Sequence, residues 1–287
     1  MDASAIDLLE IRDYLVELAY EAGNMMTNMT GKTTFVDKAN SVDLVTETDR
    51  AVEKLVADKL SLKFPDFEFM GEESYVPGVT QLTAKPTFIV DPIDGTTNFI
   101  HSFPYACTSL GFAVGREPVV GVVYNPFLKT LYTGVKGHGS YLNGQKLPLR
   151  VPPAGSELTL QGALIAIEWG TQRSGPNYDC KINTFIKLAS ESGGMVHGFR
   201  SLGSAAMNIC AVAAGQVDAY WEGGCYAWDV AAGWIILAEA GGRVVGGNPD
   251  EWSPEVDSRC YFAVRGGQGS EKFVKDFWKS MVGRLQY

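Results

Sequence analysis

The segment Phe88–Phe99 constrains this chain more than any other. An apolar run leads into Asp91, Pro92 keeps the backbone extended, and Asp94 follows three residues on. Gly95-Thr-Thr-Asn98 then has the composition of a turn that opens a helix. A rigid strand that ends at Asp91 would direct two carboxylates, and the free N–H groups of a helix start, at one point. Carboxylate oxygens suit hard cations such as Mg²⁺, and helix starts suit phosphate.

Two further acidic segments carry less information singly. Gly71-Glu-Glu-Ser74 is typical of a solvated turn, and Asp229, after Trp228, precedes an apolar helical pattern that stops at Ala240-Gly-Gly242. A cluster of these acids with Asp91 would repel itself and raise its own pKa values, and divalent cations remove that penalty. The combination predicts a metal site, whereas each segment alone is explained by a surface turn or a helix cap.

Hydrophobic periodicity predicts helices over roughly the first 28 residues and over Thr48–Leu62, with an exposed hairpin or loop at Lys32–Thr46 between them. Four β-rich runs follow, and turn residues at Gly115–Pro118 favour an antiparallel meander. The runs are Thr87–Val90, Thr108–Val114, Val119–Tyr124 and Leu131–Val135.

The pattern changes after Pro152-Pro153, where strands alternate with helices as in an α/β lobe. The expected strands are Leu164–Ile167, Val217–Trp221 and Cys260–Val264, and the expected helices are Ala205–Ala214, Val230–Ala240 and Phe273–Met281. We therefore expect one domain over residues 1–287, with an α+β lobe over about 1–151 and an α/β lobe over about 152–287. The two lobes would share one interface and one site.

Composition excludes several classes of protein. Hydrophobic residues make up 46% of the 287 positions, which is enough for a large core, and the net charge of −9 argues against a nucleic-acid or anionic-membrane surface. No apolar run reaches the roughly 20 residues of a membrane span, and the acidic amphipathic start is unlike a secretory signal. The 5 scattered cysteines lack a CxxC pair, so we expect reduced thiols and a cytoplasmic location.

Other catalytic templates are absent. Gly31-Lys-Thr33 resembles the end of a phosphate-binding loop, but Met26 occupies the place of its first glycine. No GxGxxG follows a strand, and neither GxSxG nor HExxH occurs. His101, His138 and His197 stand singly, which favours surface or core roles.

The acidic segments together resemble the inositol monophosphatase family, whose members are Mg²⁺-dependent, lithium-sensitive phosphatases. The resemblance extends from about Leu8 to Gly266 and is greatest to fungal members. It rests on Val42–Asp49, Gly71–Ser74, Asp91–Phe99, Trp228–Gly233 and Glu239–Gly242.

The resemblance implies a layered αβαβα sandwich, a homodimer, two or three Mg²⁺ ions per site, and inhibition by Li⁺. By resemblance, Glu72, Asp91 and the backbone carbonyl of Ile93 would hold one ion. Asp91, Asp94 and Asp229 would hold the second, and Glu72 with water would hold a third.

Catalytic and binding roles are likewise implied by the resemblance. Thr96, with Glu72 and Asp49, would orient and deprotonate a water molecule for in-line attack on phosphorus. The remaining assignments are Gly95, Thr96 and Thr97 for phosphate; Asp94, Ala205, Glu222, Asp229 and Thr171 for inositol hydroxyls; and Lys38 on a loop that closes over the site. Three of these residues also have an explanation without a functional role: Glu222 as a strand-end acid, Thr171 as a loop residue and Lys38 as a solvated lysine.

The expected activity is hydrolysis of myo-inositol monophosphates to inositol and phosphate. A sister phosphatase acting on a 3′,5′-bisphosphate nucleotide, another sugar phosphate or histidinol phosphate stays open as the nearest alternative. A non-catalytic regulator on the same fold, binding a protein partner, is the alternative from another class.

Overall fold

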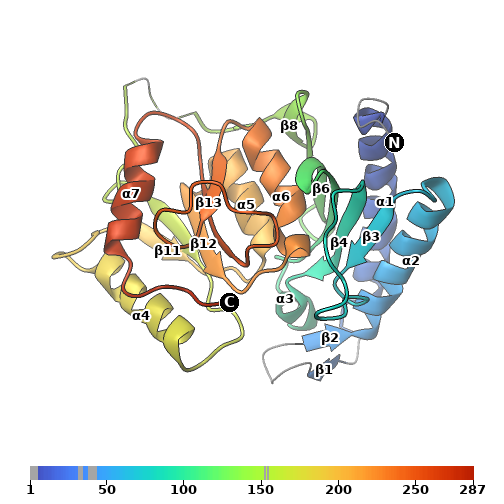
Figure 1. Cartoon of the computed structure of the whole chain (residues 1–287), viewed down its shortest axis with the longest axis horizontal. Helices are drawn as coiled ribbons and strands as arrows, with labels where there is room; N and C mark the ends of the chain where they lie inside the picture. The colour runs from blue at the N-terminus through green and yellow to red at the C-terminus, as the bar shows by residue number, and fades with distance from the viewer. Residues whose placement is uncertain (1–5, 32–34, 38–43, 152, 154) are drawn as a thin grey trace.

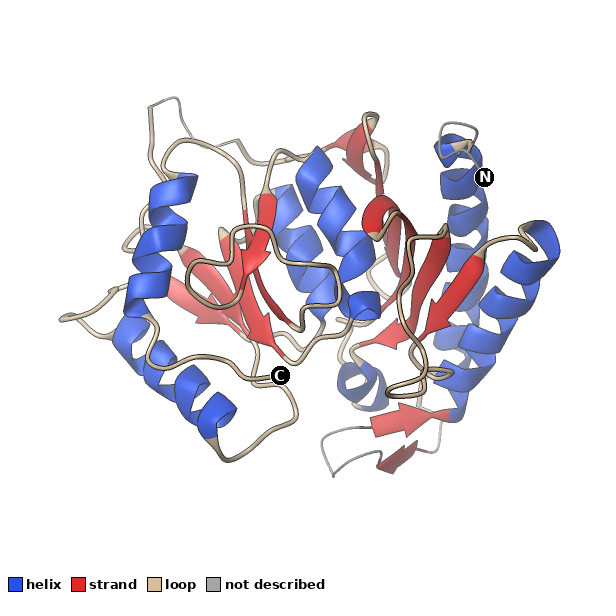
Figure 2. Cartoon of the chain, in the orientation of Figure 1, coloured by secondary structure: helices blue, strands red, loops and turns tan. Residues whose placement is uncertain are grey.

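A computed structural model describes residues 6–31, 35–37, 44–151, 153 and 155–287. Within these ranges the chain forms five layers, in which two mixed sheets alternate with pairs of helices (Figures 1 and 2). The helices are α1 (Leu8–Met29), α2 (Glu47–Lys63), α3 (Thr96–Ile100), α4 (Pro176–Ala189), α5 (Ala205–Ala214), α6 (Ala227–Glu239) and α7 (Ser270–Ser280). This arrangement confirms the expected αβαβα sandwich.

The first sheet has seven strands in the order β3-β4-β5-β6-β7-β8-β9. Its strands are β3 (Glu68–Gly71), β4 (Thr87–Asp94), β5 (Cys107–Val114), β6 (Glu117–Asn125), β7 (Thr130–Val135), β8 (Gly139–Leu142) and β9 (Gln145–Lys146). Every neighbouring pair is antiparallel except β3 and β4, which are parallel. The expected antiparallel meander is confirmed, because short turns join β5 to β6 and β6 to β7.

Helices α1 and α2 cover the outer face of this sheet (Figure 1). Their buried apolar faces pack on the aromatic and β-branched side chains of β4, β5 and β6. Asp7 caps α1 by accepting hydrogen bonds from the N–H groups of Leu9 and Glu10. Thr46 caps α2 in a reciprocal capping box with Asp49. The second cap matters for function, because it fixes the position of Asp49 at the edge of the site.

The second sheet has five strands in the order β11-β10-β12-β14-β13. Its strands are β10 (Leu164–Ile167), β11 (Gly198–Arg200), β12 (Ala219–Gly223), β13 (Arg243–Gly246) and β14 (Cys260–Val264). Strand β10 runs parallel to β11 and β12, and the other pairs are antiparallel. Helices α4 and α7 cover its outer face (Figure 1) and bury an apolar cluster against it.

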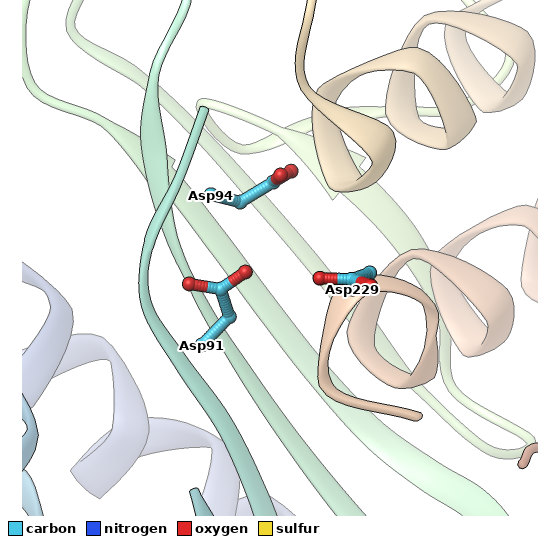
Figure 3. A group of neighbouring side chains, drawn as sticks. All are labelled: Asp91, Asp94 and Asp229. Atoms are coloured by element: carbon cyan, nitrogen blue, oxygen red, sulfur yellow. The ribbon is translucent and has the colours of Figure 1, made fainter. Parts of the chain in front are cut away.

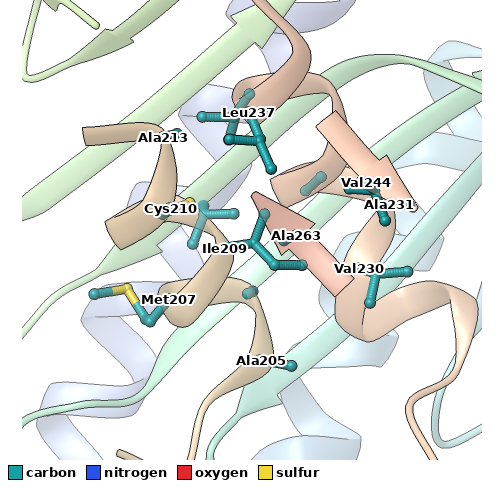
Figure 4. Packing of buried hydrophobic residues seen from close by; sticks show 14 of the residues in the cluster. Ala205, Met207, Ile209, Cys210, Ala213, Val230, Ala231, Leu237, Val244 and Ala263 are labelled. Carbon is teal, nitrogen blue, oxygen red and sulfur yellow. The ribbon is translucent and has the colours of Figure 1, made fainter. Parts of the chain in front are cut away.

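Helices α5 and α6 form the middle layer between the two sheets (Figures 1 and 4). A row of glycines on three strands lets α6 approach the seven-stranded sheet closely. Gly121 pairs with Gly111 on β5 and with Gly134 on β7. A Cβ atom at Gly121 would lie 2.2 Å from the carbonyl oxygen of Ala232, and one at Gly134 would lie 2.8 Å from the Cα of Ile236. Only glycine therefore allows α6 to sit at this height.

Several expected boundaries need correction. Strand β4 continues through Asp94 rather than ending at Asp91, because the chain resumes pairing with β5 after an irregularity. Helix α6 begins at Ala227, before the expected Val230. The expected strand at Val217 begins two residues later as β12. Each shift comes from tertiary pairing or capping, which apolar periodicity does not report.

Other elements escaped the sequence pattern altogether. Helix α4 and the short strands β3, β8, β9, β11 and β13 were not expected. The segment Lys32–Thr46 holds β1 (Phe35–Asp37) paired antiparallel with β2 (Leu44–Thr46), as a hairpin requires. Within the described ranges, no helix combines the length and apolarity that a membrane crossing needs.

Candidate active site

Three aspartates meet where β4 faces the start of α6. Asp91 and Asp94 come from β4, and Asp229 is the third residue of α6 (Figure 3). Each offers a carboxylate oxygen, and these oxygens lie within 4.8 Å of one another. Asp91 and Asp94 are buried, at 2% and 7% exposure. Such a group of oxygens has the composition that a hard divalent cation prefers.

A register shift explains why Asp91 and Asp94 share one side of β4. Asp91 pairs with Ser109 and Asp94 with Cys107, so β4 spends one more residue than β5 between the two pairs. Residues three apart in a regular strand would point to opposite faces, and an extra residue reverses that relation. Pro92 lies in this irregular stretch, where its missing N–H breaks no regular ladder.

Electrostatics show that the cluster lacks a positive partner. Burial raises the pKa of Asp91 well above its ordinary value, and the negative charges of Glu72, Asp94 and Asp229 raise it further. Burial and the charge of Asp94 likewise raise the pKa of Asp229. Oδ1 of Asp91 is buried and has no hydrogen-bond partner among the described residues. A divalent cation would satisfy this oxygen and compensate the shared charge, so the donor set fits the metal that the sequence implied.

Asp94 also connects β4 to the start of α5. Its carboxylate accepts hydrogen bonds from the Ser204 hydroxyl at 2.6 Å and from the N–H of Ala206 at 2.7 Å. The N–H of Ala205 donates to its other oxygen at 3.3 Å. Burial raises the pKa of Asp94 to about 6, although these donors oppose the shift. The contact therefore brings Ala205, an expected substrate residue, beside the carboxylate cluster.

Asp49, at the start of α2, contacts Thr96, the first residue of α3. The hydroxyl oxygen of Thr96 is 3.2 Å from Oδ1 of Asp49 and 3.1 Å from the carbonyl oxygen of Ile93. Asp49 is 1% exposed, and burial raises its pKa. The other carboxylate oxygen of Asp49 is engaged by the Thr46 cap of α2. Thr96 is thus in direct contact with Asp49, expected to act with it on water, and with the Ile93 carbonyl, expected to bind metal.

Gly95 makes the sharp turn between β4 and α3. Its φ of +90° lies in the left-handed region, and a Cβ atom there would lie 3.0 Å from the carbonyl oxygens of Gly203 and Tyr105. The Asn98 amide spans the same gap, donating to the carbonyls of Tyr105 at 2.7 Å and Leu202 at 2.6 Å. These contacts hold the first turn of α3, with exposed Thr97 as its second residue, against the loop before α5.

The two remaining polyol residues expected from the sequence, Glu222 and Thr171, lie at the end of β12 and in the loop after β10. Glu222 is 8% exposed and accepts a hydrogen bond from the Tyr220 hydroxyl. Burial raises the pKa of Glu222 to about 7, and the charge of Lys181 opposes that shift. Thr171 is exposed in the loop after β10. Lys38 lies outside the described residues.

Comparison with known proteins decides the family. The sequence model of the inositol monophosphatase family matches residues 7–281. The chain belongs to the inositol monophosphatase family. Inositol monophosphatase 2 of Saccharomyces cerevisiae is 56% identical over 257 residues, which cover 88% of this chain and 87% of that protein. Inositol monophosphatase 1 of the same yeast is 48% identical over 98% of this chain and 99% of its own length.

More distant members agree with this assignment. Human inositol monophosphatase 1 is 41% identical over 86% of this chain and 88% of that protein. The solved inositol monophosphatase from Anabaena superposes with a TM-score of 0.79 at 29% identity, covering 96% of this chain and 97% of that one. The family resemblance read from the acidic motifs is confirmed.

Glu72 is the fourth carboxylate expected to bind metal. It is not part of the group that the three aspartates form within 4.8 Å. It follows β3 directly, and its N–H donates to the carbonyl of Val90 at 3.1 Å. Its negative charge is close enough to raise the pKa values of Asp91 and Asp229. The structure thus places Glu72 at the margin of the cluster.

Glu53 and Glu168 support the site in ways that the sequence motifs did not indicate. The Glu53 carboxylate accepts the N–H of Glu73 at 2.7 Å, and a Cβ atom at Gly71 would lie 2.5 Å from Oε2 of Glu53. Glu168 accepts the N–H groups of Leu202 at 2.6 Å and Gly203 at 2.9 Å. Glu168 had one usable signal, because it follows the apolar strand β10 just as Asp91 follows an apolar run.

Proposed function

We propose that this chain hydrolyses myo-inositol monophosphates to myo-inositol and phosphate with Mg²⁺. The carboxylate group of Asp91, Asp94 and Asp229 carries the proposal: Asp91 and Asp94 are buried, and Oδ1 of Asp91 has no hydrogen-bond partner among the described residues. The yeast and human relatives at 56%, 48% and 41% identity are all named inositol monophosphatases, which favours the inositol ester over the other substrates considered.

The three aspartates, with Glu72 and the carbonyl of Ile93, would hold two or three Mg²⁺ ions. When bound, these ions would supply the positive charge that lowers the pKa of a water molecule and stabilises charge on the transferring phosphoryl group. We expect Li⁺ to inhibit by competing for this acidic site. No side-chain nucleophile is then required for attack on phosphorus.

The residues of the chain would place the water and receive its proton. The hydroxyl of Thr96 lies within hydrogen-bond distance of Asp49, so Asp49 can accept its proton while the Thr96 oxygen accepts one from water. Glu72, at the margin of the cluster, would take part in orienting and deprotonating that water. We assign catalytic roles to Thr96, Glu72 and Asp49 on this basis.

The phosphate would bind at the first turn of α3. The N–H groups of Gly95, Thr96 and Thr97 and the hydroxyl of Thr97 are the proposed donors, and the left-handed turn at Gly95 presents them beside β4. The polyol would lie toward α5 and β12. Its proposed contacts are Asp94, Ala205, Glu222, Asp229 and Thr171.

A phosphate-release assay tests the proposal. The chain should hydrolyse myo-inositol 1-phosphate with a rate that depends on Mg²⁺ and falls with Li⁺, and it should prefer this ester to adenosine 3′,5′-bisphosphate. Preference for the nucleotide would reassign the substrate while retaining the metal site. Absence of turnover on both esters would contradict the proposed activity and revive the regulatory alternative.

We propose one domain with lobes at about 1–151 and 152–287, supported by a core cluster that joins Ile89 and Val123 to residues of α5 and α6. Pro152, at the expected boundary, lies outside the described residues. We also propose a homodimer, which the family resemblance supports, and a cytoplasmic location, which the 5 free, buried cysteines support.

A further inference from the structure

Lys181 on α4 is an unusually buried lysine, with 1% of its surface exposed. Lysine is almost never fully buried unless its ammonium is paired, because desolvating the charge is costly. Its Nζ donates to the carbonyl oxygen of Gly223 at 2.9 Å and to that of Trp169 at 3.2 Å. None of the roles assigned above to the site explains this side chain.

The two carbonyls belong to the segments that carry two of the expected polyol contacts, Glu222 and Thr171. Gly223 directly follows Glu222, and Trp169 lies two residues before Thr171. A Cβ atom built on Gly170, between Trp169 and Thr171, would lie 2.8 Å from Nζ of Lys181 and 3.7 Å from Oε1 of Glu222. The ammonium and the carboxylate therefore converge on the backbone of one turn.

The segment at Gln286 and Tyr287 packs against the Lys181 ammonium. The ring centroid of Tyr287 is 5.6 Å from Nζ of Lys181. A Cβ atom at Gly223 would lie 2.7 Å from the Tyr287 ring, so glycine is needed for this contact. Asn177 on α4 fixes the approach, because it accepts the N–H of Gln286 at 2.6 Å and donates to its carbonyl at 2.8 Å. The Lys181 ammonium and the Glu222 carboxylate thus lie near the same residue, Gly170, in surroundings with little water to screen their charges.

We propose that Lys181 is a positioning residue for the polyol half of the substrate, tying the end of β12 to the turn before Thr171 so that Glu222 is held as a hydrogen-bond acceptor for a ring hydroxyl. The inference rests on the proposed function. It adds a residue that touches neither phosphate nor the metal ligands. Its effect should therefore appear in recognition of the alcohol and not in the chemistry at phosphorus.

Lys181→Gln is the informative variant, because the shorter, neutral amide removes the charge and weakens the hydrogen bonds to both carbonyls. With myo-inositol 1-phosphate we expect KM to rise about tenfold, as for loss of a hydrogen bond to a charged group, with kcat within about twofold. The inhibition constant for inorganic phosphate, which has no polyol, should stay unchanged. Lys187→Gln, which removes an exposed lysine from the same helix, is the matched control.

A double variant separates positioning from a general structural role. In a Glu222→Gln background, Lys181→Gln should raise KM no further, because its effect passes through Glu222. An unchanged KM in the single variant, or equal losses for substrate and inorganic phosphate, would overturn the inference. If the single variant does not fold, the double variant decides. If the double variant folds, Lys181 is needed because of the charge of Glu222. If the double variant also fails to fold, Lys181 has a general structural role, and the inference is overturned.

A wild-type chain that hydrolyses myo-inositol 1-phosphate, with a KM insensitive to Lys181→Gln, would contradict the positioning role alone. A wild-type chain that does not hydrolyse this ester would contradict the proposed function itself.

Discussion

Asp94 serves two neighbours at once, since it belongs to the carboxylate cluster and also receives the first N–H groups of α5. Asp229 has a similar double position, because its Oδ2 accepts the N–H of Tyr226 at 2.6 Å at the start of α6. Each side chain therefore couples the charge of the site to a helix start. Substitutions that keep the shape but remove the charge separate the two roles.

For Asp229→Asn we expect turnover of myo-inositol 1-phosphate to fall at least about 100-fold, because a neutral amide is a poor ligand for a hard cation. The amide oxygen can still accept the Tyr226 N–H, so the circular dichroism spectrum should match wild type. Asp250→Asn, at an exposed loop position, is the control. Wild-type turnover in Asp229→Asn would contradict the metal assignment.

Thr96 gives a second test at this scale. Thr96→Val removes the hydroxyl that contacts Asp49, and we expect kcat to fall about 100-fold or more, within the range of general acid–base catalysis. Thr96→Ser restores the hydroxyl and should recover most of the rate. If valine and serine behaved alike in a steady-state assay, the hydroxyl would have no part in proton transfer.

The sequence predicted a metal site from the combination of its acidic segments, and the structure brings three of the predicted carboxylates together: Asp91, Asp94 and Asp229. Glu53 could not be predicted, since it lies in a helix among other charged residues, and its contacts with the N–H of Glu73 and with Gly71 exist only in the folded chain. Lys181 gave no signal either. A lysine in a short amphipathic helix is ordinarily solvated, and only the folded chain shows that it points into the second sheet.

Among the elements, the position of α6 depends most on the glycines of the strands that it packs against. Its own sequence explains why it is a buried helix, and the periodicity of the strands explains the meander. The row formed by Gly111, Gly121 and Gly134 was invisible, because the three residues become neighbours only through the registers of β5, β6 and β7. The extra residue between Asp91 and Asp94 was equally hidden, since a strand pattern does not reveal where pairing shifts.

Gly121→Val should push α6 away from the sheet and move Asp229 with it. The added atoms would overlap the carbonyl of Ala232, so we expect a loss of about 1–3 kcal/mol in the free energy of unfolding, as for other overpacked cores. Urea unfolding measures the loss, and the apparent affinity for Mg²⁺ should weaken in parallel. Gly162→Ala, at an exposed position with only a mild contact, should leave both unchanged.

For the whole molecule, the buried carboxylates make metal-free stability depend on pH. The pKa of Asp94 is raised to about 6 and that of Glu222 to about 7, against ordinary values near 4. Groups with raised pKa values bind protons more tightly in the folded state. Their contribution to stability is therefore complete below about pH 4 and is lost as pH rises through about 6 to 7.

We expect the Tm of the metal-free chain to fall between about pH 5.5 and 8 through these groups, and the gain in Tm on adding Mg²⁺ to grow over the same range. The gain grows because the cation binds deprotonated carboxylates. Differential scanning calorimetry with chelator and with Mg²⁺ measures both trends. In Asp229→Asn the gain in Tm on adding Mg²⁺ should depend less on pH. A gain independent of pH would show that Mg²⁺ binds elsewhere.

The glycine row under α6 acts as a mechanical stop at the centre of the molecule. The contacts there are between backbone atoms. No change of side-chain rotamer can therefore bring α6 closer to the sheet or give it a second distance from the sheet. Movements of α1, α2, α4 and α7 must cross a rigid sheet or this stop before they reach Asp229. The spacing between Asp229 and the two aspartates of β4 is therefore set by the glycine row, whereas α2 and α4, which carry Asp49 and Lys181, bear on the site directly.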